Sequence, residues 1–196
     1  NTVVGVLCNG AATGSLSVLS PNTTAGYSYS WQNINNTGVV ISNTNTATNL
    51  VAGEYVLYAE YLNYAGCIVT DTVTVTELAA ITNTAIVTDV DCYGNATGSV
   101  VVSQVVGGET PYTMQWTPTG QNTSLTSGTY TLTITDINNC QEVEVFDVIE
   151  PQALQTSITQ NGYVLTASTV TGGTMPYSYS WREQSLPNNQ IGTGST

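Results

Sequence analysis

Residues 125–135 read LTSGTYTLTIT, and the alternation inside this stretch is the clearest structural signal in the chain. Tyr130, Leu132 and Ile134 would point to one side of an extended strand, and the threonines between them to the other side. Such alternation is typical of a strand with one buried and one solvated face. The stretch therefore predicts a half-buried β-strand that starts near Gly128.

The same beginning, Leu-x-x-Gly-x-Tyr, occurs a second time at Leu50, Gly53 and Tyr55. In both places the tyrosine comes just after a tight turn. This arrangement is similar to the tyrosine corner of immunoglobulin-like sandwiches, in which the hydroxyl ties a loop back to its strand. We therefore expect Tyr55 and Tyr130 to hold equivalent positions.

Other landmarks also recur at fixed spacings. Cys8 and Cys92 are 84 residues apart, as are the glycines that follow them, whereas Cys67 and Cys140 are 73 residues apart. Several identical offsets indicate a tandem repeat, and a repeat defines domain edges better than propensity does. The shorter second spacing reflects an insertion in the first copy, near residues 33–47.

The repeat predicts three modules. The first occupies residues 1–78, the second residues 79–151, and the third, which is truncated, residues 152–196. Within the third, the segment from Gly172 to Trp181 matches the segment from Gly107 to Trp116 at an offset of 65. The third module reaches Thr196 before any Leu-x-x-Gly-x-Tyr segment, so we expect the chain to be an internal or mature piece of a longer repetitive protein. The third module also lacks a leading cysteine, which suggests a divergent or terminal-type repeat.

Each module consists of short alternating segments broken by glycine, asparagine and proline, which is typical of a small antiparallel sandwich. The predicted fold class is therefore all-β, with tandem immunoglobulin-like antiparallel β-sandwich modules. Alternate aromatic or apolar residues of one strand in each module should face the core. They are Tyr27, Tyr29 and Trp31, then Tyr112, Met114 and Trp116, then Tyr177, Tyr179 and Trp181.

Four cysteines allow three pairings. If the modules fold alike, their cysteines pair alike, which predicts bonds from Cys8 to Cys67 and from Cys92 to Cys140. Each bond would stabilise its module by about 4 kcal/mol in the chain-entropy model. Metal-binding or catalytic thiols are the competing interpretation, which the wide spacing and the lack of histidine disfavour.

Charge excludes several classes of partner. One Lys or Arg stands against thirteen Asp and Glu, for a formal net charge of -12. Nucleic acid and anionic lipid need cationic side chains, so neither is expected to bind. No segment approaches the roughly 20 apolar residues of a membrane span, so direct membrane insertion is not expected either.

The chain lacks most of the side chains that catalysis commonly uses. Without His or Lys, nucleophiles lack their usual bases and only carboxylate pairs remain, so we expect no enzyme activity. We expect no cofactor except, as an alternative, Ca²⁺ held near the junction of the first two modules. Its candidate ligands are Glu77, Asp89 and Asp91, although their spacing does not match an EF-hand loop.

The pattern from Cys92 to Cys140 resembles the SprB repeat. It comprises Cys-x-Gly-x-x-x-Gly-Ser, Gly-Gly-x-x-Pro-Tyr-x-x-x-Trp, Leu-x-x-Gly-x-Tyr-x-x-x-x-x-Asp and a closing Cys. The resemblance implies a structural or adhesive segment of a large surface filament of gliding and related Bacteroidetes, exported by type IX secretion and attached to the outer membrane. Its implied partners are neighbouring repeats, an extracellular surface or polysaccharide, and the secretion and gliding machinery. It carries over no catalytic residue.

Two other functions stay open. A carbohydrate-binding module would use exposed aromatics, for which Tyr58 and Tyr64 are the candidates. An accessory domain of a secreted hydrolase would need a catalytic domain elsewhere in its parent chain. Asp71-Thr72-Val73 fits the Asp-Thr-apolar motif for O-glycosylation in this bacterial group, which makes Thr72 a candidate modification site.

Overall fold

The computed structural model describes residues 1–19, 26–64, 66–118, 120–183 and 185–195. In this part of the chain every regular element is a strand, apart from the short 3-10 helix η1 (Ile34–Asn36), and no helix is long and apolar enough to cross a membrane. The chain divides into two compact units. The first comprises Asn1–Asn83, Gln104–Met114 and Thr133–Glu142, and the second Thr84–Ser103, Gln115–Leu132 and Val143–Thr196.

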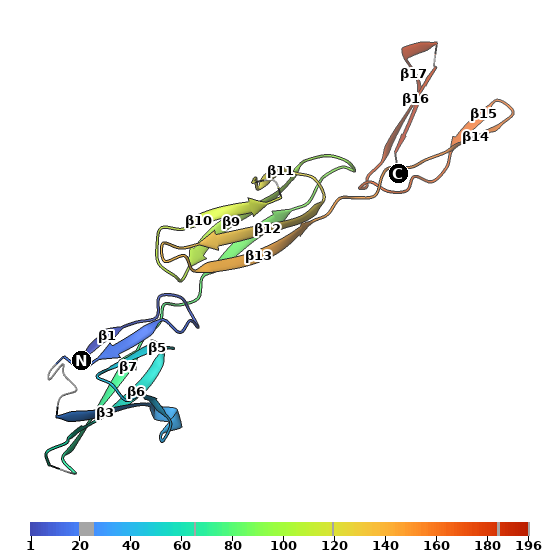
Figure 1. Cartoon of the computed structure of the whole chain (residues 1–196). Helices are drawn as coiled ribbons and strands as arrows, with labels where there is room; N and C mark the ends of the chain where they lie inside the picture. The colour runs from blue at the N-terminus through green and yellow to red at the C-terminus, as the bar shows by residue number, and fades with distance from the viewer. Residues whose placement is uncertain (20–25, 65, 119, 184, 196) are drawn as a thin grey trace. The chain divides into compact units, whose positions relative to one another are not determined.

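Two antiparallel sheets build the amino-terminal sandwich of the first unit (Figure 1). One sheet has the order β1-β2-β5, from β1 (Thr2–Val4), β2 (Gly14–Ser17) and β5 (Thr46–Leu50). The other has the order β4-β3-β6-β7, from β4 (Val40–Ser42), β3 (Tyr27–Asn33), β6 (Gly53–Tyr61) and β7 (Ile68–Val75). The segment 33–47 thus supplies η1 and the extra edge strand β4.

The core of this sandwich lies between its sheets. Trp31 is fully buried and its indole N–H donates to the carbonyl of Thr44 at 3.2 Å. Gly14 explains why the sheets can approach closely, because a Cβ there would lie 2.7 Å from Val75 Cγ1. The buried cluster consists of Val6, Leu16, Tyr29, Trp31, Ala47, Leu50, Tyr55, Leu57 and Val75.

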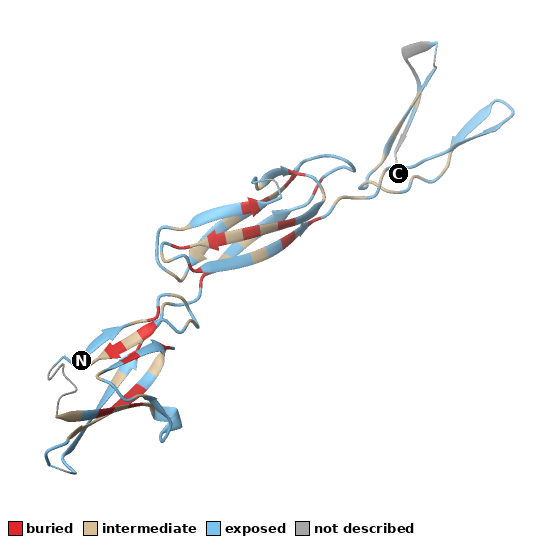
Figure 2. Ribbon diagram, in the orientation of Figure 1, coloured by how far each residue is buried: buried red, intermediate tan, exposed pale blue. Residues whose placement is uncertain are grey.

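Residues 82–148 form a second pair of three-stranded sheets, with buried positions alternating along the strands (Figure 2). The order β11-β9-β8 joins β11 (Thr123–Leu125), β9 (Gly98–Val106) and β8 (Thr82–Thr88). The order β10-β12-β13 joins β10 (Thr113–Thr117), β12 (Gly128–Thr135) and β13 (Gln141–Val148). The all-β antiparallel sandwich fold is confirmed.

The alternation predicted for β12 is confirmed, since Tyr130, Leu132 and Ile134 are buried. Both tyrosine corners form. The Tyr55 hydroxyl donates to the carbonyl of Val51 at 2.9 Å, and the Tyr130 hydroxyl donates to the carbonyl of Thr126 at 2.9 Å.

The expected burial of the alternate aromatics is confirmed for Tyr29 and Trp31 in the first copy and for Trp116 in the second. Trp116 is buried and packs on Phe146 with ring centroids 5.9 Å apart. Met114, however, is 46 % exposed, so its expected burial is wrong. It lies on the edge strand β10, on which Trp116 alone is buried.

The third copy forms two hairpins in the second unit. One pairs β14 (Ile158–Asn161) with β15 (Val164–Ala167), and the other pairs β16 (Ser178–Glu183) with β17 (Leu186–Ser195). Trp181 and Tyr179 are half-buried. The module boundaries at 78 and 151 stay a prediction from the repeat.

Candidate functional site

The most distinctive chemical feature of the chain is a disulfide between Cys8 and Cys140, whose Cα atoms are 5.4 Å apart. Both cysteines belong to the first compact unit. Cys67 and Cys92 are exposed free thiols. The predicted pairs, Cys8 with Cys67 and Cys92 with Cys140, are therefore wrong. The bond instead links a residue of the first sequence repeat to one of the second.

Strand geometry explains the correction. Cys67 immediately precedes β7, whereas Cys8 lies near Glu77, which follows β7, because Val6 bridges to Glu77. An extended strand of this length separates its two ends by about 25 Å. A disulfide needs Cα atoms within about 7 Å of each other. The two cysteines of the first repeat thus lie at opposite ends of one strand.

The second repeat has the same arrangement. Cys140 immediately precedes β13, whereas the loop that carries Cys92 is tied to Glu150, which follows β13. Pairing within this repeat would again have to span a whole strand. The prediction assumed that modules of the same fold form disulfides within themselves. Such modules can also form a disulfide from one module to the next, as Cys8 and Cys140 do.

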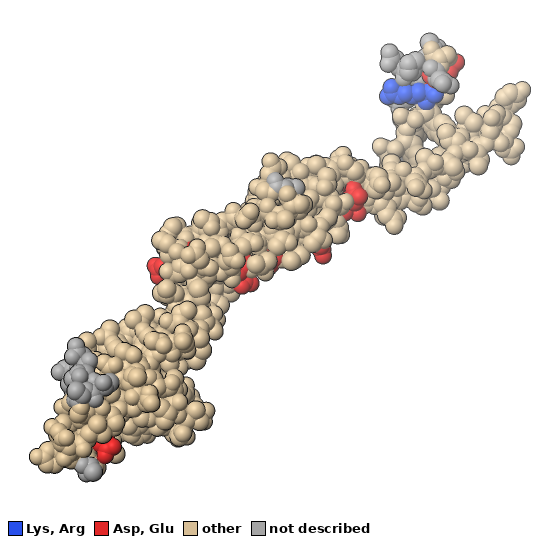
Figure 3. Space-filling model, in the orientation of Figure 1, with Lys and Arg blue, Asp and Glu red and all other residues tan. Residues whose placement is uncertain are grey.

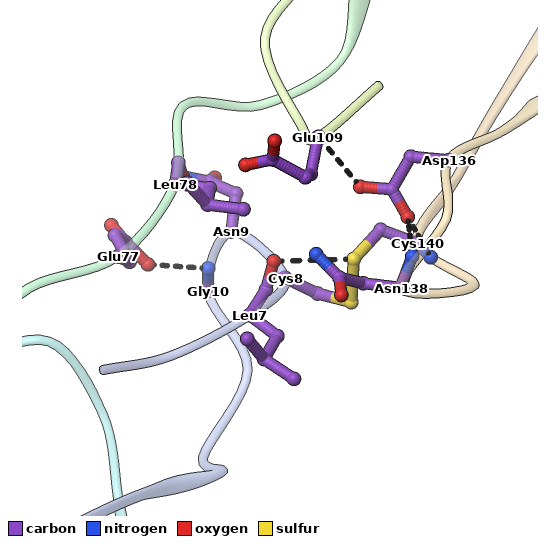
Figure 4. The surroundings of a disulfide bond; sticks show 10 residues. All are labelled: Leu7, Cys8, Asn9, Gly10, Glu77, Leu78, Glu109, Asp136, Asn138 and Cys140. Atoms are coloured by element: carbon purple, nitrogen blue, oxygen red, sulfur yellow. Dashed lines mark hydrogen bonds between the residues drawn. A yellow bond between two sulfur atoms is a disulfide. The ribbon is translucent and has the colours of Figure 1, made fainter. Parts of the chain in front are cut away.

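On one side of the disulfide, Cys8 sits in a tight loop that is anchored at two points (Figure 4). The Gly10 N–H donates to Glu77 Oε2 at 2.7 Å, and Asn9 Nδ2 donates to the carbonyl of Leu78 at 3.2 Å. The loop also closes on itself, because the Ala11 N–H donates to the carbonyl of Cys8 at 3.0 Å. These bonds fix the Cys8 backbone beside the end of the first repeat.

On the other side, Asp136 organises the loop that presents Cys140 (Figure 4). Its Oδ1 accepts the N–H groups of Asn138 and Cys140, both at 2.8 Å, and its Oδ2 accepts the N–H of Glu109 at 3.0 Å. Asp136 is 4 % exposed. A buried carboxylate that accepts three backbone donors holds its loop in one conformation.

The pKa of Asp136 reflects this environment. Burial acts to raise the pKa of the carboxyl, but the N–H donors of Cys140, Glu109 and Asn138 favour the charged form. The donors outweigh burial, and the pKa lies below its ordinary value. Asp136 is therefore ionised at neutral pH, which is the form that accepts all three bonds.

A cavity of about 350 Å³ adjoins the disulfide in the first unit. Leu7, Cys8, Ala80, Ile81 and Gly108 line it together with residues 139–142 of the Cys140 loop. Cys140 Sγ lies 3.3 Å from the carbonyl oxygen of Leu7, and because a disulfide sulfur carries no hydrogen this is a close contact. The chemistry that this arrangement supplies is a covalent cross-link.

The three predicted calcium ligands do not form a cluster. Among the residues that the structure describes, no three His, Cys, Asp or Glu side chains gather as a metal site. Glu77 accepts from Gly10, and Asp89 Oδ1 accepts the N–H of Ile149 at 3.0 Å. Asp91 Oδ1 accepts the Thr97 hydroxyl at 2.6 Å, which is the largest cause that lowers its pKa. Calcium binding stays a prediction.

The two candidate sugar-binding tyrosines have different surroundings. Tyr64 is 68 % exposed and its ring stacks on Tyr61, with centroids 5.7 Å apart. Tyr61 in turn packs against Tyr27 at 5.1 Å. Tyr58 is on β6 three residues before Tyr61, and alternation places it on the opposite sheet face. The structure thus adds Tyr27 and Tyr61, and not Tyr58, to the surroundings of Tyr64.

Thr72 lies on β7, an edge strand of its sheet, and is exposed. This position makes the hydroxyl accessible, and its glycosylation stays a prediction. Acidic side chains are spaced singly over the visible face of the molecule (Figure 3). No acidic patch stands out on that face.

Sequence reasoning missed two residues of the disulfide site. Asp136 was part of the quoted motif but received no role, and Glu77 was considered only as a metal ligand. A signal existed for Glu77, because Glu77 and Glu150 keep the same place in both repeats. In both repeats the glutamate accepts the N–H of the glycine that lies two residues after the leading cysteine. This glycine is Gly10 in the first repeat and Gly94 in the second.

Comparison with solved structures finds distant likenesses. A complex of the C-terminal 282-residue fragment of intimin with the translocated intimin receptor (Tir) intimin-binding domain gives a TM-score of 0.38 at 15% identity, over 80% of this chain and 64% of that chain. Sidekick-1 immunoglobulin domains 1–5 give 0.33 at 14% identity, over 98% and 48%. Drosophila OTK extracellular domains 3–5 give 0.30 at 12% identity, over 76% and 59%. The chain spans less than two thirds of each.

Comparison by sequence is more specific. No curated protein matches the chain. Residues 84–121 match the family model described as the SprB repeat. This segment runs from β8 to just after β10 and includes Cys92, Gly98, Gly107 and Trp116. The chain therefore carries a SprB-type repeat in its second copy.

Proposed function

We propose that this chain is a stalk segment of a cell-surface adhesin, in which a disulfide between consecutive repeats limits how far the stalk can extend. The observation that carries the proposal is the Cys8–Cys140 bond, which encloses most of both repeats at a sequence separation of 132. The SprB-type match supports the surface adhesin class. The role is structural, without enzyme activity.

The physical argument concerns the path of a pulling force. A force applied at the two chain ends enters at Cys8 and leaves at Cys140 through the bond between their sulfur atoms. The enclosed residues then bear little of the load. In the chain-entropy model the same bond stabilises the folded state by about 5 kcal/mol. Strands β2 to β12, which the bond encloses, therefore cannot be drawn out while it is intact, whereas β1 and β13 lie outside it.

Single-molecule pulling on residues 1–196 tests this proposal. With the bond intact, unfolding should release only the residues outside the loop. Reduction should add roughly 450 Å of extension, the contour length of the enclosed residues. The matched control is the double variant Cys8→Ser, Cys140→Ser, which should show the long extension without reductant. Equal extension of the oxidised and reduced chain would refute the proposal.

The partners follow from the same proposal. Neighbouring repeats contact one another along the stalk, and the adhesin meets an extracellular surface or polysaccharide. Export by type IX secretion, attachment to the outer membrane and coupling to gliding belong to the proposal through the SprB-type match. Antibody labelling of intact and permeabilised cells checks the location, and intact cells should be labelled. Labelling that requires permeabilisation, as it does for a cytoplasmic control protein, would contradict the proposed location.

Carbohydrate binding is the second candidate, and one observation favours it. A pocket of about 310 Å³ in the first unit is lined by Tyr27, Tyr29, Tyr61 and Asp71, which combines aromatic faces with a carboxylate. Sugars bind such combinations by stacking and hydrogen bonding. A glycan array with the wild type and Tyr61→Ala tests it, using Tyr58→Ala as the control on the other sheet face. Binding that both variants keep would contradict this placement.

A further inference from the structure

Cys92 occupies the position in the second repeat that Cys8 occupies in the first, and two of the hydrogen bonds of the Cys8 loop recur there. The Gly94 N–H donates to Glu150 Oε2 at 2.7 Å, the same length as from Gly10 to Glu77. The Asn95 N–H donates to the carbonyl of Cys92 at 3.0 Å, as Ala11 does to Cys8. The second repeat therefore builds the same cysteine loop, but its thiol is free.

The segment that follows each repeat is also built alike. In the first unit the Gly108 N–H donates to the carbonyl of Ala79 at 2.8 Å. In the second unit the Gly173 N–H donates to the carbonyl of Gln152 at 2.7 Å. Each bond brings the Gly-Gly turn of one copy against the first residues of that copy.

The adjoining glycines make the match closer. Gly107 and Gly172 have φ values of +81° and +74°. A Cβ on Gly107 would lie 1.9 Å from the carbonyl oxygen of Ala80, and one on Gly172 would lie 2.0 Å from that of Ala153. Only glycine permits both this backbone and this approach. The two junction segments are thus equivalent in detail.

A pocket of about 450 Å³ opens beside Cys92, and all its lining residues belong to the second unit. Cys92 and Tyr93 take the places that Cys8 and Asn9 have in the first cavity, while Leu154 and Gly173 take those of Ile81 and Gly108. Among the residues that the structure describes, one element of the first cavity has no counterpart in the lining of this pocket, namely the closing loop of residues 139–142.

We propose that Cys92 and this pocket receive the cysteine loop that closes a third repeat of the same polypeptide, and form with it a second disulfide equivalent to Cys8–Cys140. At the offset of 65 that relates Gly107 to Gly172, the counterpart of Cys140 falls after Thr196. The pocket is the empty half of the site, and its apolar lining from Leu154, Pro176 and Tyr177 fits a loop backbone and its cystine.

The bond forms by exchange with a disulfide oxidant such as oxidised glutathione. The Cys92 thiolate attacks the oxidant, forms a mixed disulfide and releases one thiol. The incoming cysteine thiolate then attacks the Cys92 sulfur and releases the second thiol. Two cysteine thiols thus lose two protons and two electrons, and the oxidant is reduced to two thiols.

A chimeric chain tests the inference. Residues 1–181 are followed by residues 117–151, since Trp181 corresponds to Trp116, so that the graft completes the third repeat with a second copy of Cys140. The exposed Ile137 is changed to Val in the graft alone, which marks its peptide by mass. After refolding in glutathione buffer, the protein is alkylated and digested with pepsin under non-reducing conditions.

The expected product is a monomer in which Cys92 is bonded to the marked cysteine, Cys8 is bonded to the unmarked Cys140, and Cys67 is alkylated. The control Cys92→Ser should leave the marked cysteine alkylated as well. An alkylated Cys92, or a Cys92 bonded only between chains, in molecules that hold the Cys8–Cys140 bond would overturn the inference. These readouts are masses, so they are independent of the pulling experiment.

If the graft does not fold, the closing segment 117–151 is supplied as a separate polypeptide to the chain of residues 1–196. Cys67 is the internal control, because it is also exposed but corresponds to Cys140 and not to Cys8. Capture at Cys92 should exceed capture at Cys67 about tenfold, through the local concentration that a fitting pocket provides. Equal capture at both thiols, or no capture, would overturn the inference.

Discussion

Single atoms at the sheet contacts decide whether each sandwich can close. Gly98 on β9 approaches β13 so closely that a Cβ would lie 2.6 Å from Val148 Cγ1 and 2.9 Å from the carbonyl oxygen of Leu125. Gly14 makes the same approach to Val75. The Gly-Ser pair that recurs in both repeats is thus explained by packing between sheets.

We predict that Gly98→Ala destabilises the chain by about 1–3 kcal/mol, because the added methyl group overpacks the core. Urea unfolding of the oxidised protein measures the change. Val148→Ala in the same background should recover part of the loss, since it removes the nearer of the two clashing groups. Unchanged stability of Gly98→Ala would show that the sheets are not in this contact.

The hydroxyl groups of the two tyrosine corners also stabilise the fold. Tyr130→Phe removes only the hydroxyl that donates to the carbonyl of Thr126. We expect a loss of about 0.5–1.5 kcal/mol in unfolding free energy, and a similar loss for Tyr55→Phe. Tyr163→Phe serves as the control, because Tyr163 is fully exposed and should cost nothing measurable. Equal stability of all three variants would contradict the corner geometry.

At the scale of elements, the loop from Asp136 to Cys140 depends on one ionised carboxylate. Because the pKa of Asp136 is lower in the folded chain, protonation favours unfolding. The stabilisation from its three N–H bonds is present above the unfolded pKa of about 4 and is lost as pH falls below that value.

We therefore expect wild-type stability to fall more steeply between about pH 5 and pH 2 than that of Asp136→Asn, whose amide does not titrate. Denaturant unfolding at a series of pH values measures both curves. The acidic shift of Asp91 is shared by both proteins and cancels in the comparison. Parallel curves would remove Asp136 from the account of this loop.

Elements that depend on a local sequence pattern could be predicted from the sequence. The β12 alternation and both tyrosine corners depend on residues within one strand and its preceding turn, and they were predicted correctly. The disulfide could not be read in the same way, because cysteine spacing does not tell which end of a sandwich a residue reaches. That Cys67 precedes β7 while Cys8 adjoins its far end becomes evident only once the strand is placed.

In the molecule as a whole, the disulfide does not follow the boundaries of the sequence repeats, because it joins a cysteine of the first repeat to a cysteine of the second. Each of the first two repeats holds one cysteine at the start of its last strand and another near the end of that strand, and the Cys8–Cys140 bond joins the two repeats. The sequence correctly predicted the sandwich class and the SprB-type pattern, which occupies residues 84–121. The predicted disulfides within each module were wrong, because the observed disulfide joins one repeat to the next.

Non-reducing peptide mapping tests the pairing of Cys8 with Cys140. The chain of residues 1–196 is folded in glutathione buffer, alkylated, and digested with pepsin at acid pH, where disulfide exchange is slow. The account predicts one linked pair of peptides, joining Cys8 to Cys140, together with alkylated Cys67 and Cys92. Linked peptides that join Cys8 to Cys67 and Cys92 to Cys140 would contradict it.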